Sequence, residues 1–430
     1  MSHELFRSSI AAVVLVLTAC AGGTDAGEDG GAGLDGADRA LEWEREVLYE
    51  VGGAEAEGWA AFGRIVDVGF DGEGRLYVLD SQASQVHVLS RDGSLVRSIG
   101  TSGEGPGELS QAFGMAVFAD GTVSVFDIGK FSLVVYGPDG EWIRDLRIDP
   151  SETGLLSTPI LPLPYHNVLA SIGGRVRMGP PAAGSEPPEP GRAIVMVPLD
   201  EAESLGPQVV MRGWEAPPPG GAGEQTTMRG QGGAAISLQM NRMRAFTPAV
   251  RLGVLRDGRI LMVDTTTYRI RIHGSDGTAQ SQLSRPIPPI PVTSPIEEKE
   301  RARRLAAIES GGGLTVMTFG RGGGAAQMPD MSEMQRNQIA DMIFYPEIQV
   351  IERIAADWQD RIWVERASGN PGEPGPTDVI TADGDYVGTL APDGLRTPRA
   401  FGPDGLAAWI ETDDLDVQHV VVARIPSSRD

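Results

Sequence analysis

A repeated seven-residue pattern constrains the fold of this chain more than any other feature. Residues 74–80 read GRLYVLD, residues 121–127 read GTVSVFD and residues 258–264 read GRILMVD. In each copy the Asp lies six residues after the Gly, and an Asp-Gly pair begins twelve residues after that Asp. Gly and Asp-Gly supply the positive φ angles that tight turns between antiparallel strands require. Each copy therefore predicts a meander of four short strands.

Weaker copies extend the pattern along most of the chain. They lie at residues 354–364, 404–425 and, more divergently, 168–199. The last copy lacks its outer strand, and residues 46–51 (EVLYEV) are expected to supply it and close the ring. Four-stranded repeats of about 40–50 residues are typical of β-propellers. The sequence thus predicts an all-β fold over residues 41–426, a six-bladed β-propeller of four-stranded antiparallel blades.

Two insertions interrupt the repeats. Residues 217–243 are rich in Gly, Pro and Gln and are predicted to be a loop. Residues 294–343, between blades four and five, predict a helical insertion, because Ser294 and Glu297 form a capping box and Ser332 opens a second helix. Two placements remain open for this helical pair: a lid over one end of the central channel, or a hairpin packed against the blade edges.

The N-terminal segment predicts export and a lipid anchor. Residues 1–19 combine Arg7 with a short apolar run, as a signal peptide does. Residues 17–20 (LTAC) resemble a bacterial lipobox, which implies cleavage before Cys20 and lipidation of its thiol. Ala21 favours the outer membrane by analogy with bacterial sorting. Residues 20–40 are mostly Gly, Asp and Ala and are predicted to be a disordered tether.

Charge and cysteine content exclude several classes of protein. The net charge of −23 argues against nucleic-acid binding and against docking on anionic lipid, since both need clustered Lys and Arg. Cys20 is the single cysteine, so no intramolecular disulfide and no multi-cysteine metal site can form. We therefore expect a monomer that contacts the membrane only through lipidated Cys20.

Four segments carry a resemblance to known families: residues 74–80, 100–109 (GTSGEGPGEL), 258–264 and 413–422 (DDLDVQHVVV). They resemble NHL-like six-bladed propellers, and more closely a bacterial set of secreted or lipidated six-bladed β-propeller proteins. The resemblance implies the fold but no particular reaction. The polar residue that usually follows the strand-ending Asp of NHL repeats is replaced by Phe131 and Tyr268 in two blades.

No residue pattern predicts a catalytic site, a cofactor or a metal. Asp80, Asp127 and Asp264 occupy equivalent places in three repeats, so we interpret them as turn caps rather than catalysts. The histidines are isolated in sequence, and residues 320–324 (GRGGG) lack the Lys-Ser/Thr of a phosphate-binding loop.

Four arginines are candidates for ligand binding. Arg251 and Arg353 occupy equivalent positions on predicted inner strands, and Arg64 and Arg399 lie near the corresponding positions of other blades. Because inner strands line the axial channel, these side chains are expected to converge on an anionic ligand or on a partner's carboxylate. The alternative is that they pair with neighbouring acids such as Asp67 and Glu352.

Two classes of function follow. The first is a binding scaffold of the cell envelope, whose channel mouth and loops contact a protein, peptide or glycan. The second is a calcium-dependent hydrolase of the gluconolactonase or strictosidine-synthase-like type, whose ion would need about six to eight oxygen ligands. Asparagine is scarce in this chain (Asn167, Asn241, Asn337 and Asn370), which favours the scaffold.

Overall fold

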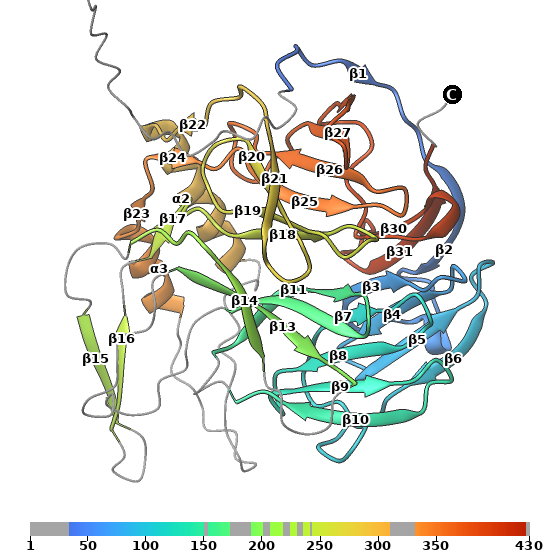
Figure 1. The fold of residues 1–430 in the computed structure, drawn as a ribbon. Helices are drawn as coiled ribbons and strands as arrows, with labels where there is room; N and C mark the ends of the chain where they lie inside the picture. Colours follow the sequence, from blue (N-terminus) through green and yellow to red (C-terminus); the bar gives the residue numbers. More distant parts are fainter. Residues whose placement is uncertain are drawn as a thin grey trace, which may run out of the picture.

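Six antiparallel sheets form a ring in the computed structural model (Figure 1). The structure describes residues 34–149, 154–172, 191–200, 207–217, 224–229, 235–240, 243–309 and 332–426. Each sheet is one blade with four antiparallel strands, and the inner strands contact one another from blade 6 through blades 1, 2, 3 and 4 to blade 5. The prediction of an all-β, six-bladed β-propeller is confirmed.

The first three blades follow one another along the chain. Blade 1 contains β3 (Ile65–Phe70), β4 (Leu76–Asp80), β5 (Gln85–Leu89) and β6 (Leu95–Ile99). Blade 2 contains β7 (Ala112–Val117), β8 (Val123–Asp127), β9 (Ser132–Tyr136) and β10 (Trp142–Arg147). Blade 3 contains β11 (Leu156–Leu163), β12 (Asn167–Ile172), β13 (Arg192–Pro198) and β14 (Gln208–Gly213).

The other three blades complete the ring. Blade 4 contains β18 (Arg251–Val254), β19 (Ile260–Val263), β20 (Arg269–His273) and β21 (Ala279–Ser284). Blade 5 contains β25 (Ile351–Ala356), β26 (Arg361–Arg366), β27 (Thr377–Thr381) and β28 (Tyr386–Leu390). Blade 6 contains β29 (Ala400–Phe401), β30 (Leu406–Thr412), β31 (Gln418–Arg424) and β2 (Glu46–Gly52).

The ring closes through β2, as the repeat count predicts. This N-terminal strand pairs antiparallel with β31, from Glu46 opposite Arg424 to Gly52 opposite His419. It becomes the outer strand of blade 6, so one sheet is built from both ends of the propeller sequence. The pairing ties the first and last blades together and covers a sheet edge that would otherwise be free.

The turn residues of the repeat have the backbone angles that the sequence predicts. Gly74, Gly121 and Gly258 have φ angles of 76°, 92° and 88° between the first and second strands of their blades. In blade 5 Asp360 takes this place with a φ of 56°. Asp tolerates the left-handed region better than most residues, so the weaker copy still turns at the same point.

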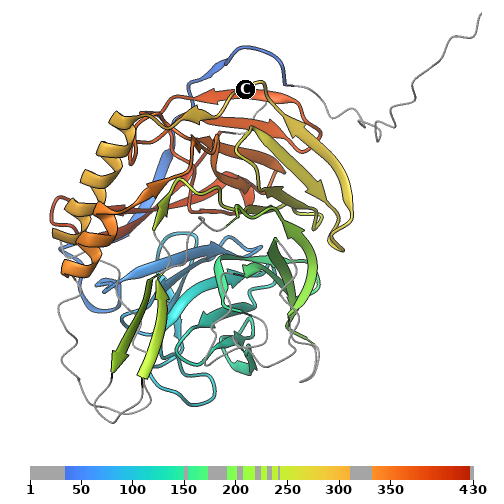
Figure 2. The same ribbon diagram turned by 90° about the vertical axis from the view of Figure 1, so that its left-hand side faces the viewer.

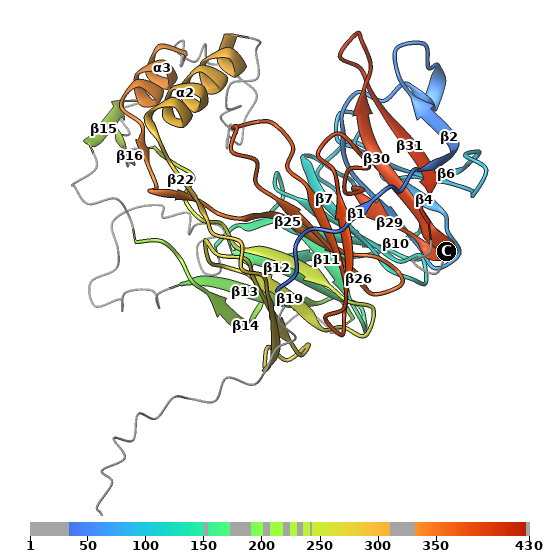
Figure 3. The ribbon, with the colours of Figure 1, turned by 90° about the horizontal axis from the view of Figure 1, so that it is seen from above.

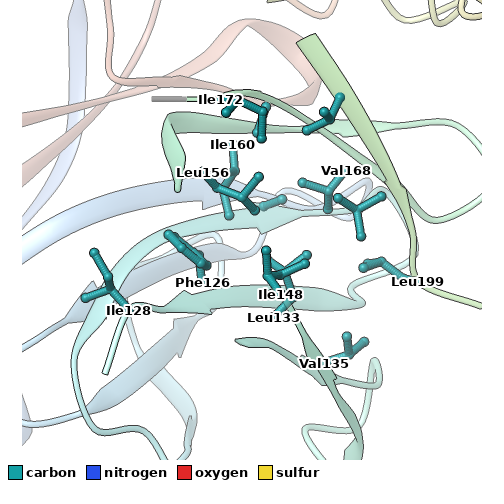
Figure 4. Packing of buried hydrophobic residues seen from close by; sticks show 14 of the residues in the cluster. Phe126, Ile128, Leu133, Val135, Ile148, Leu156, Ile160, Val168, Ile172 and Leu199 are labelled. Atoms are coloured by element: carbon teal, nitrogen blue, oxygen red, sulfur yellow. The ribbon is translucent and has the colours of Figure 1, made fainter. Parts of the chain in front are cut away.

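Hydrophobic side chains fill the spaces between blades. The described core divides into six clusters, and each cluster joins two neighbouring blades. Between blades 2 and 3, for example, Phe126 and Leu133 pack against Val168 and Leu199 (Figure 4). Burying one such side chain stabilises a fold by roughly 1.5–3 kcal/mol. The blades therefore stabilise one another in pairs around the ring.

The predicted disordered tether (residues 20–40) is ordered at its C-terminal end. Leu34 is buried in the cluster between blades 4 and 5, and Asp38 contacts Arg285 and Arg366. β1 (Ala40–Leu41) pairs parallel with β28 as a fifth strand of blade 5. The prediction is wrong for residues 34–40, because the buried Leu34, the ion pairs of Asp38 and the hydrogen bonds of Arg39 to Tyr386 and Val387 dock this segment on the propeller. Residues 1–33, including the signal peptide and Cys20, lie outside the described residues.

The helical insertion lies between blades 4 and 5, as predicted. α2 (Ser294–Glu309) includes Ser294 as its first helical residue instead of as the predicted cap, and the N–H of Glu297 donates to Thr293 O. The helix contains the ion pairs Glu297–Arg301 and Glu300–Arg304, with closest atoms at 3.5 and 2.6 Å. α3 (Ser332–Ala340) ends before Ile343, which belongs to a strand instead. Both helices lie at the edge of the propeller (Figures 2 and 3). Neither helix has the length and apolar character that a bilayer-spanning helix needs, nor has any other helix of the described chain.

Short strand pairs fasten the insertion to the propeller. β17 (Arg244–Ala245) pairs parallel with β23 (Ile343–Phe344), and β22 (Ile290–Pro291) pairs antiparallel with β24 (Glu347–Ile348). The segment 217–243, predicted as a loop, contains a two-stranded hairpin instead, formed by β15 (Glu224–Arg229) and β16 (Ala235–Met240). In residues 235–240 (AISLQM) the large apolar residues alternate with small or polar ones, and this pattern suits a strand despite the flanking glycines.

Candidate functional site

A cavity lies on the propeller axis. Residues of β3, β7, β11, β18, β25 and β29, the inner strands of all six blades, line a volume of about 760 Å³. Glycines let these strands approach one another closely: a Cβ at Gly69 would lie 2.7 Å from Val117 Cγ2, and one at Gly114 would lie 2.8 Å from Thr158 Cγ2. No residue of α2 or α3 in the described part of the chain lines the cavity, which favours the blade-edge placement over a lid.

Three of the four candidate arginines line this cavity. Arg251, Arg353 and Arg399 all lie at or near the start of an inner strand, and the repeated topology places these starts at the same end of the channel. Arg251 and Arg353 also share a register position, three residues before the last ladder pair of the inner strand. The alignment of the repeats therefore identified three side chains that line the same end of the channel.

Arg64 is the exception. It is exposed, precedes β3 and does not line the cavity. The backbone N–H groups of Gly63 and Arg64 donate to the two carboxylate oxygens of Asp80, at 2.8 and 3.0 Å. These bonds fix residues 63–64 in the turn outside the channel. The prediction of Arg64 as a channel residue is wrong because this turn, and not the strand, sets the position of its side chain.

Arg399 is paired with an acid, as the alternative prediction has it. Its Nε donates to Asp67 Oδ1 at 3.0 Å, and its terminal nitrogen lies 2.9 Å from the same oxygen. The N–H of Met115 donates to Asp67 Oδ2 at 3.1 Å. Burial raises the pKa of Asp67, while Arg399 and the N–H of Met115 oppose that shift. The pair joins blades 6, 1 and 2 at the channel wall.

Arg353 is held by backbone carbonyl groups instead of an acid. Its two terminal nitrogens donate to the carbonyl oxygens of Thr397 and Pro398, at 3.0 and 2.5 Å. Burial and the neighbouring Arg399 lower the pKa of Arg353 to about 10, so the side chain still carries its charge at neutral pH. Only part of the five-donor guanidinium is used by these contacts.

Arg251 is the unpaired member of the group. It donates no hydrogen bond to the described residues, and its Nε is buried without a partner. Burial lowers its pKa, and the nearby Arg192 lowers it further, while Glu352 raises it. Burial and Glu365 raise the pKa of Glu352. Leaving a buried hydrogen-bond donor without an acceptor destabilises a protein by about 1–3 kcal/mol. A ligand that brings an acceptor to Arg251 would remove this cost.

The equivalent aspartates are structural, as predicted. Asp80 accepts hydrogen bonds from the segment just before β3, and Asp127 accepts them from Ser110 and Gln111 just before β7. Asp264 accepts one from the N–H of Trp214, at 2.6 Å, although 50 residues separate the two. The same cap therefore recurs even where an insertion lengthens the connection.

The opposite end of the cavity contains a cluster that the sequence did not reveal. His166 and Asp120 line it, and the imidazole contacts two carboxylates: Nε2 lies 2.9 Å from Asp120 Oδ2, and Nδ1 lies 3.0 Å from Asp200 Oδ2. Partial burial lowers the pKa of His166, but the hydrogen bonds to both carboxylates outweigh it and raise the pKa overall. Since the acids come from different elements, no local motif predicts this group.

The residues of the cavity do not fit a calcium ion. Asp67 is engaged by Arg399 and Met115, and Asp120 by His166 and Thr122. No set of three or more His, Cys, Asp or Glu within the described ranges is placed to hold a metal. With guanidinium groups sharing the cavity, its donor set lacks the oxygen cage that calcium needs.

Comparisons with known proteins agree with the fold. The profile of a family described as "6-bladed beta-propeller" matches residues 60–164, which cover blades 1 and 2 and the start of blade 3. No curated protein matches the sequence.

Solved structures that resemble the chain include three bacterial proteins. A putative exported protein from Bacteroides fragilis is 13% identical, with 91% of this chain and 97% of that chain covered and a TM-score of 0.45. The calcium-binding protein regucalcin from Agrobacterium tumefaciens is 13% identical, with 89% and 95% covered and a TM-score of 0.37. A gluconolactonase from Xanthomonas campestris is 11% identical, with 90% and 91% covered and a TM-score of 0.38. The six sheets and the family profile together identify the fold of this chain as a six-bladed β-propeller.

Proposed function

We propose that this protein is a binding scaffold of the cell envelope that contacts its partner through the arginine-bearing end of its channel. The partner is a protein, peptide or glycan that presents an anionic group. The observation that carries the proposal is Arg251, a partly buried guanidinium that lines the cavity and uses none of its donors within the described chain. The calcium-dependent hydrolase is not proposed, because the cavity's donor set does not fit the ion.

The size and charge of the cavity support binding. Ligand sites in proteins occupy about 300–1,000 Å³ and combine apolar walls with a few polar groups, and this cavity of about 760 Å³ falls within that range. At this end the cavity is lined by the three arginines and by two acids, Asp67 and Glu352, while Glu365 acts on Arg353 and Glu352 from outside the lining. The lining itself therefore carries one more positive than negative charge in a chain whose net charge is −23, which favours an anionic ligand.

The location in the envelope rests on the N-terminal sequence. The lipobox-like residues 17–20 and lone Cys20 support lipid attachment, and the outer membrane is the expected site. Residue 34, where the described chain begins, already docks on the propeller, at the space between blades 4 and 5. The part of the tether available to separate the propeller from the lipid is thus shorter than the sequence alone predicts.

The test is affinity capture from an envelope extract with matched variants. The double variant Arg251→Ala/Arg353→Ala and the channel-filling variant Ala355→Trp, whose half-buried site lines the cavity, are expected to lose the captured partner. Arg64→Ala and Val96→Trp, both at exposed sites outside the cavity, are the controls for charge and for bulk. Capture that survives both channel variants would refute a role for the channel.

A further inference from the structure

We propose that the channel binds the free C-terminal end of an extended polypeptide, with the terminal carboxylate on Arg251 and the preceding residues along the inner strands. This inference rests on the proposed function and specifies the ligand of the same site. Three features of the cavity lead to it: an unused guanidinium, unpaired strand edges, and walls of small and apolar side chains.

The first feature selects a carboxylate. A guanidinium presents its N–H donors in a planar fork that matches the two oxygens of a carboxylate. Arg251 donates to no group in the described chain, and Arg353, at the same register position of the next blade, keeps donors free beyond its two carbonyl contacts. The inner strands of these two blades, β18 and β25, contact each other. Glu352 is the acid whose charge raises the pKa of Arg251, yet the two side chains form no ion pair within 4.0 Å.

The second feature selects a ligand with peptide groups. Every inner strand is the terminal strand of its sheet, so its axial edge has no ladder partner among the described strands. Asp67 accepts from the N–H groups of Val68 and Met115, which satisfies two of these edge groups. The remaining edges offer N–H and C=O groups to the channel, and an extended chain satisfies such groups by main-chain hydrogen bonds. An alkyl chain would leave them unpaired at a cost.

The third feature limits the side chains of the ligand. Leu161, Val254 and Ala355 line the cavity and are only half-buried, so part of their apolar surface faces it. Gly69 and Gly253 also line the cavity, and at these two positions no side chain occupies its space. Small or aliphatic residues at the end of the bound chain therefore fit this wall better than charged ones. The charge of Glu352 also disfavours an acidic side chain next to the terminal carboxylate.

A pair of peptide libraries tests the carboxylate directly. The probes are two hexapeptide mixtures with the last three positions randomised, one ending in a free carboxylate and the other in an amide. Immobilised full-length protein is incubated with each mixture, and the retained peptides are identified by mass spectrometry. We expect retention of the free-acid mixture only, with small and aliphatic residues enriched at the last positions. Equal retention of both mixtures, or of neither, would overturn the proposal.

Variants then assign the contact to Arg251, using the best retained peptide as the probe. Arg251→Gln is expected to weaken its binding by about 10- to 100-fold, the range for losing one hydrogen-bonded charge contact. Glu352→Gln is expected to strengthen it by up to about fivefold, because a repelling charge disappears. Arg64→Gln makes the same charge change outside the cavity and is expected to leave binding unchanged. An Arg251→Gln protein that binds as well as the wild type overturns the assignment.

Two further outcomes separate this inference from the proposed function. Decanoate has a carboxylate and an apolar tail but no peptide groups, and we expect it not to displace the peptide. Displacement by decanoate at the peptide's own concentration would overturn the polypeptide assignment. If envelope capture depends on the channel while no free-acid peptide is retained, the proposed function stands and this inference falls. If Ala355→Trp and Arg251→Ala/Arg353→Ala both leave capture and peptide retention intact, both fall.

Discussion

Replacing Arg285 by Met is expected to destabilise the propeller by about 3–5 kcal/mol, the usual cost of removing one partner from a buried ion pair. Arg285 follows β21 of blade 4, and its side chain is 2% exposed. Its Nη1 lies 2.8 Å from Oδ2 of Asp378, a blade 5 residue whose side chain is fully buried. The other terminal nitrogen donates to Gly36 O and to Asp38 Oδ1, both at 3.0 Å, which docks the N-terminal segment on the same guanidinium.

The magnitude follows from what remains after the change. Asp378 would keep a hydrogen bond from Thr389, at 2.5 Å, and a distant contact with Arg366, at 3.7 Å. Its charge would stay buried without a close partner. By contrast, Asp38 is 47% exposed, so Asp38→Asn removes contacts that water largely replaces and is expected to cost only about 0–1 kcal/mol. The two variants break the same network from its buried and its exposed side.

Urea titration of each variant measures the difference in free energy of unfolding. The double variant Arg285→Met/Asp378→Asn removes the stranded charge and is expected to be more stable than Arg285→Met alone, since a buried pair costs most when only one partner is lost. Amide exchange of residues 34–41 reports the docking separately and is expected to quicken in Arg285→Met. The reasoning is refuted if Arg285→Met costs no more than Asp38→Asn, or if the double variant is the least stable of the three.

Three other predictions concern the far end of the channel, the anchor and the ring closure. Asp120 and Asp200 raise the pKa of His166 above its usual 6.5, so the stabilisation from these contacts is complete below pH 6.5 and is lost as the pH rises through the raised pKa. His166→Asn is therefore expected to lower the Tm at about pH 6 but not at about pH 9. The loss at about pH 6 corresponds to less than about 1 kcal/mol of stability. Cys20→Ser is expected to move the protein from the membrane fraction to the soluble fraction on cell fractionation, and unchanged fractionation contradicts lipid anchoring. A chain lacking the outer strand at residues 46–52 is expected to aggregate, as seen by light scattering, whereas one lacking only the residues before 42 is expected to stay monomeric.

The blades were predictable because their signals are local. A Gly turn, a strand-ending Asp and an Asp-Gly hairpin lie within about twenty residues of one another and recur at fixed spacing. Asp80 shows why the spacing is fixed: it caps the segment before its own blade's inner strand, so strand length and cap must agree. Even Asp360 in the place of Gly preserves the turn. Repetition thus reveals positions that blades 1, 2 and 4 share for their own folding.

Contacts between distant segments could not be predicted in this way. Residues 34–40 have the composition of a disordered tether, yet the pocket for Leu34, the two arginines around Asp38 and the blade 5 partners of Arg39 order them. The cluster around His166 joins residues from two blades, with the imidazole between Asp120 and Asp200. In each case the stabilising partner is set by the tertiary fold, and the local sequence carries no signal for it.

The channel site depends on a position where the repeats differ. Three residues before the last ladder pair of the inner strand, blade 1 has Asp67, blade 2 has Gly114, blade 4 has Arg251 and blade 5 has Arg353. Packing between blades does not require one residue type here, since a carboxylate, a glycine and two guanidinium groups all occur in the same ring. Asp67 pairs with Arg399 of the neighbouring blade 6, and Arg353 donates to two carbonyl groups, but Arg251 has no hydrogen-bond partner within the described chain. A fold gains nothing from leaving a charged group unpaired, so folding does not explain the residue at this position of blade 4, whereas the proposed function does.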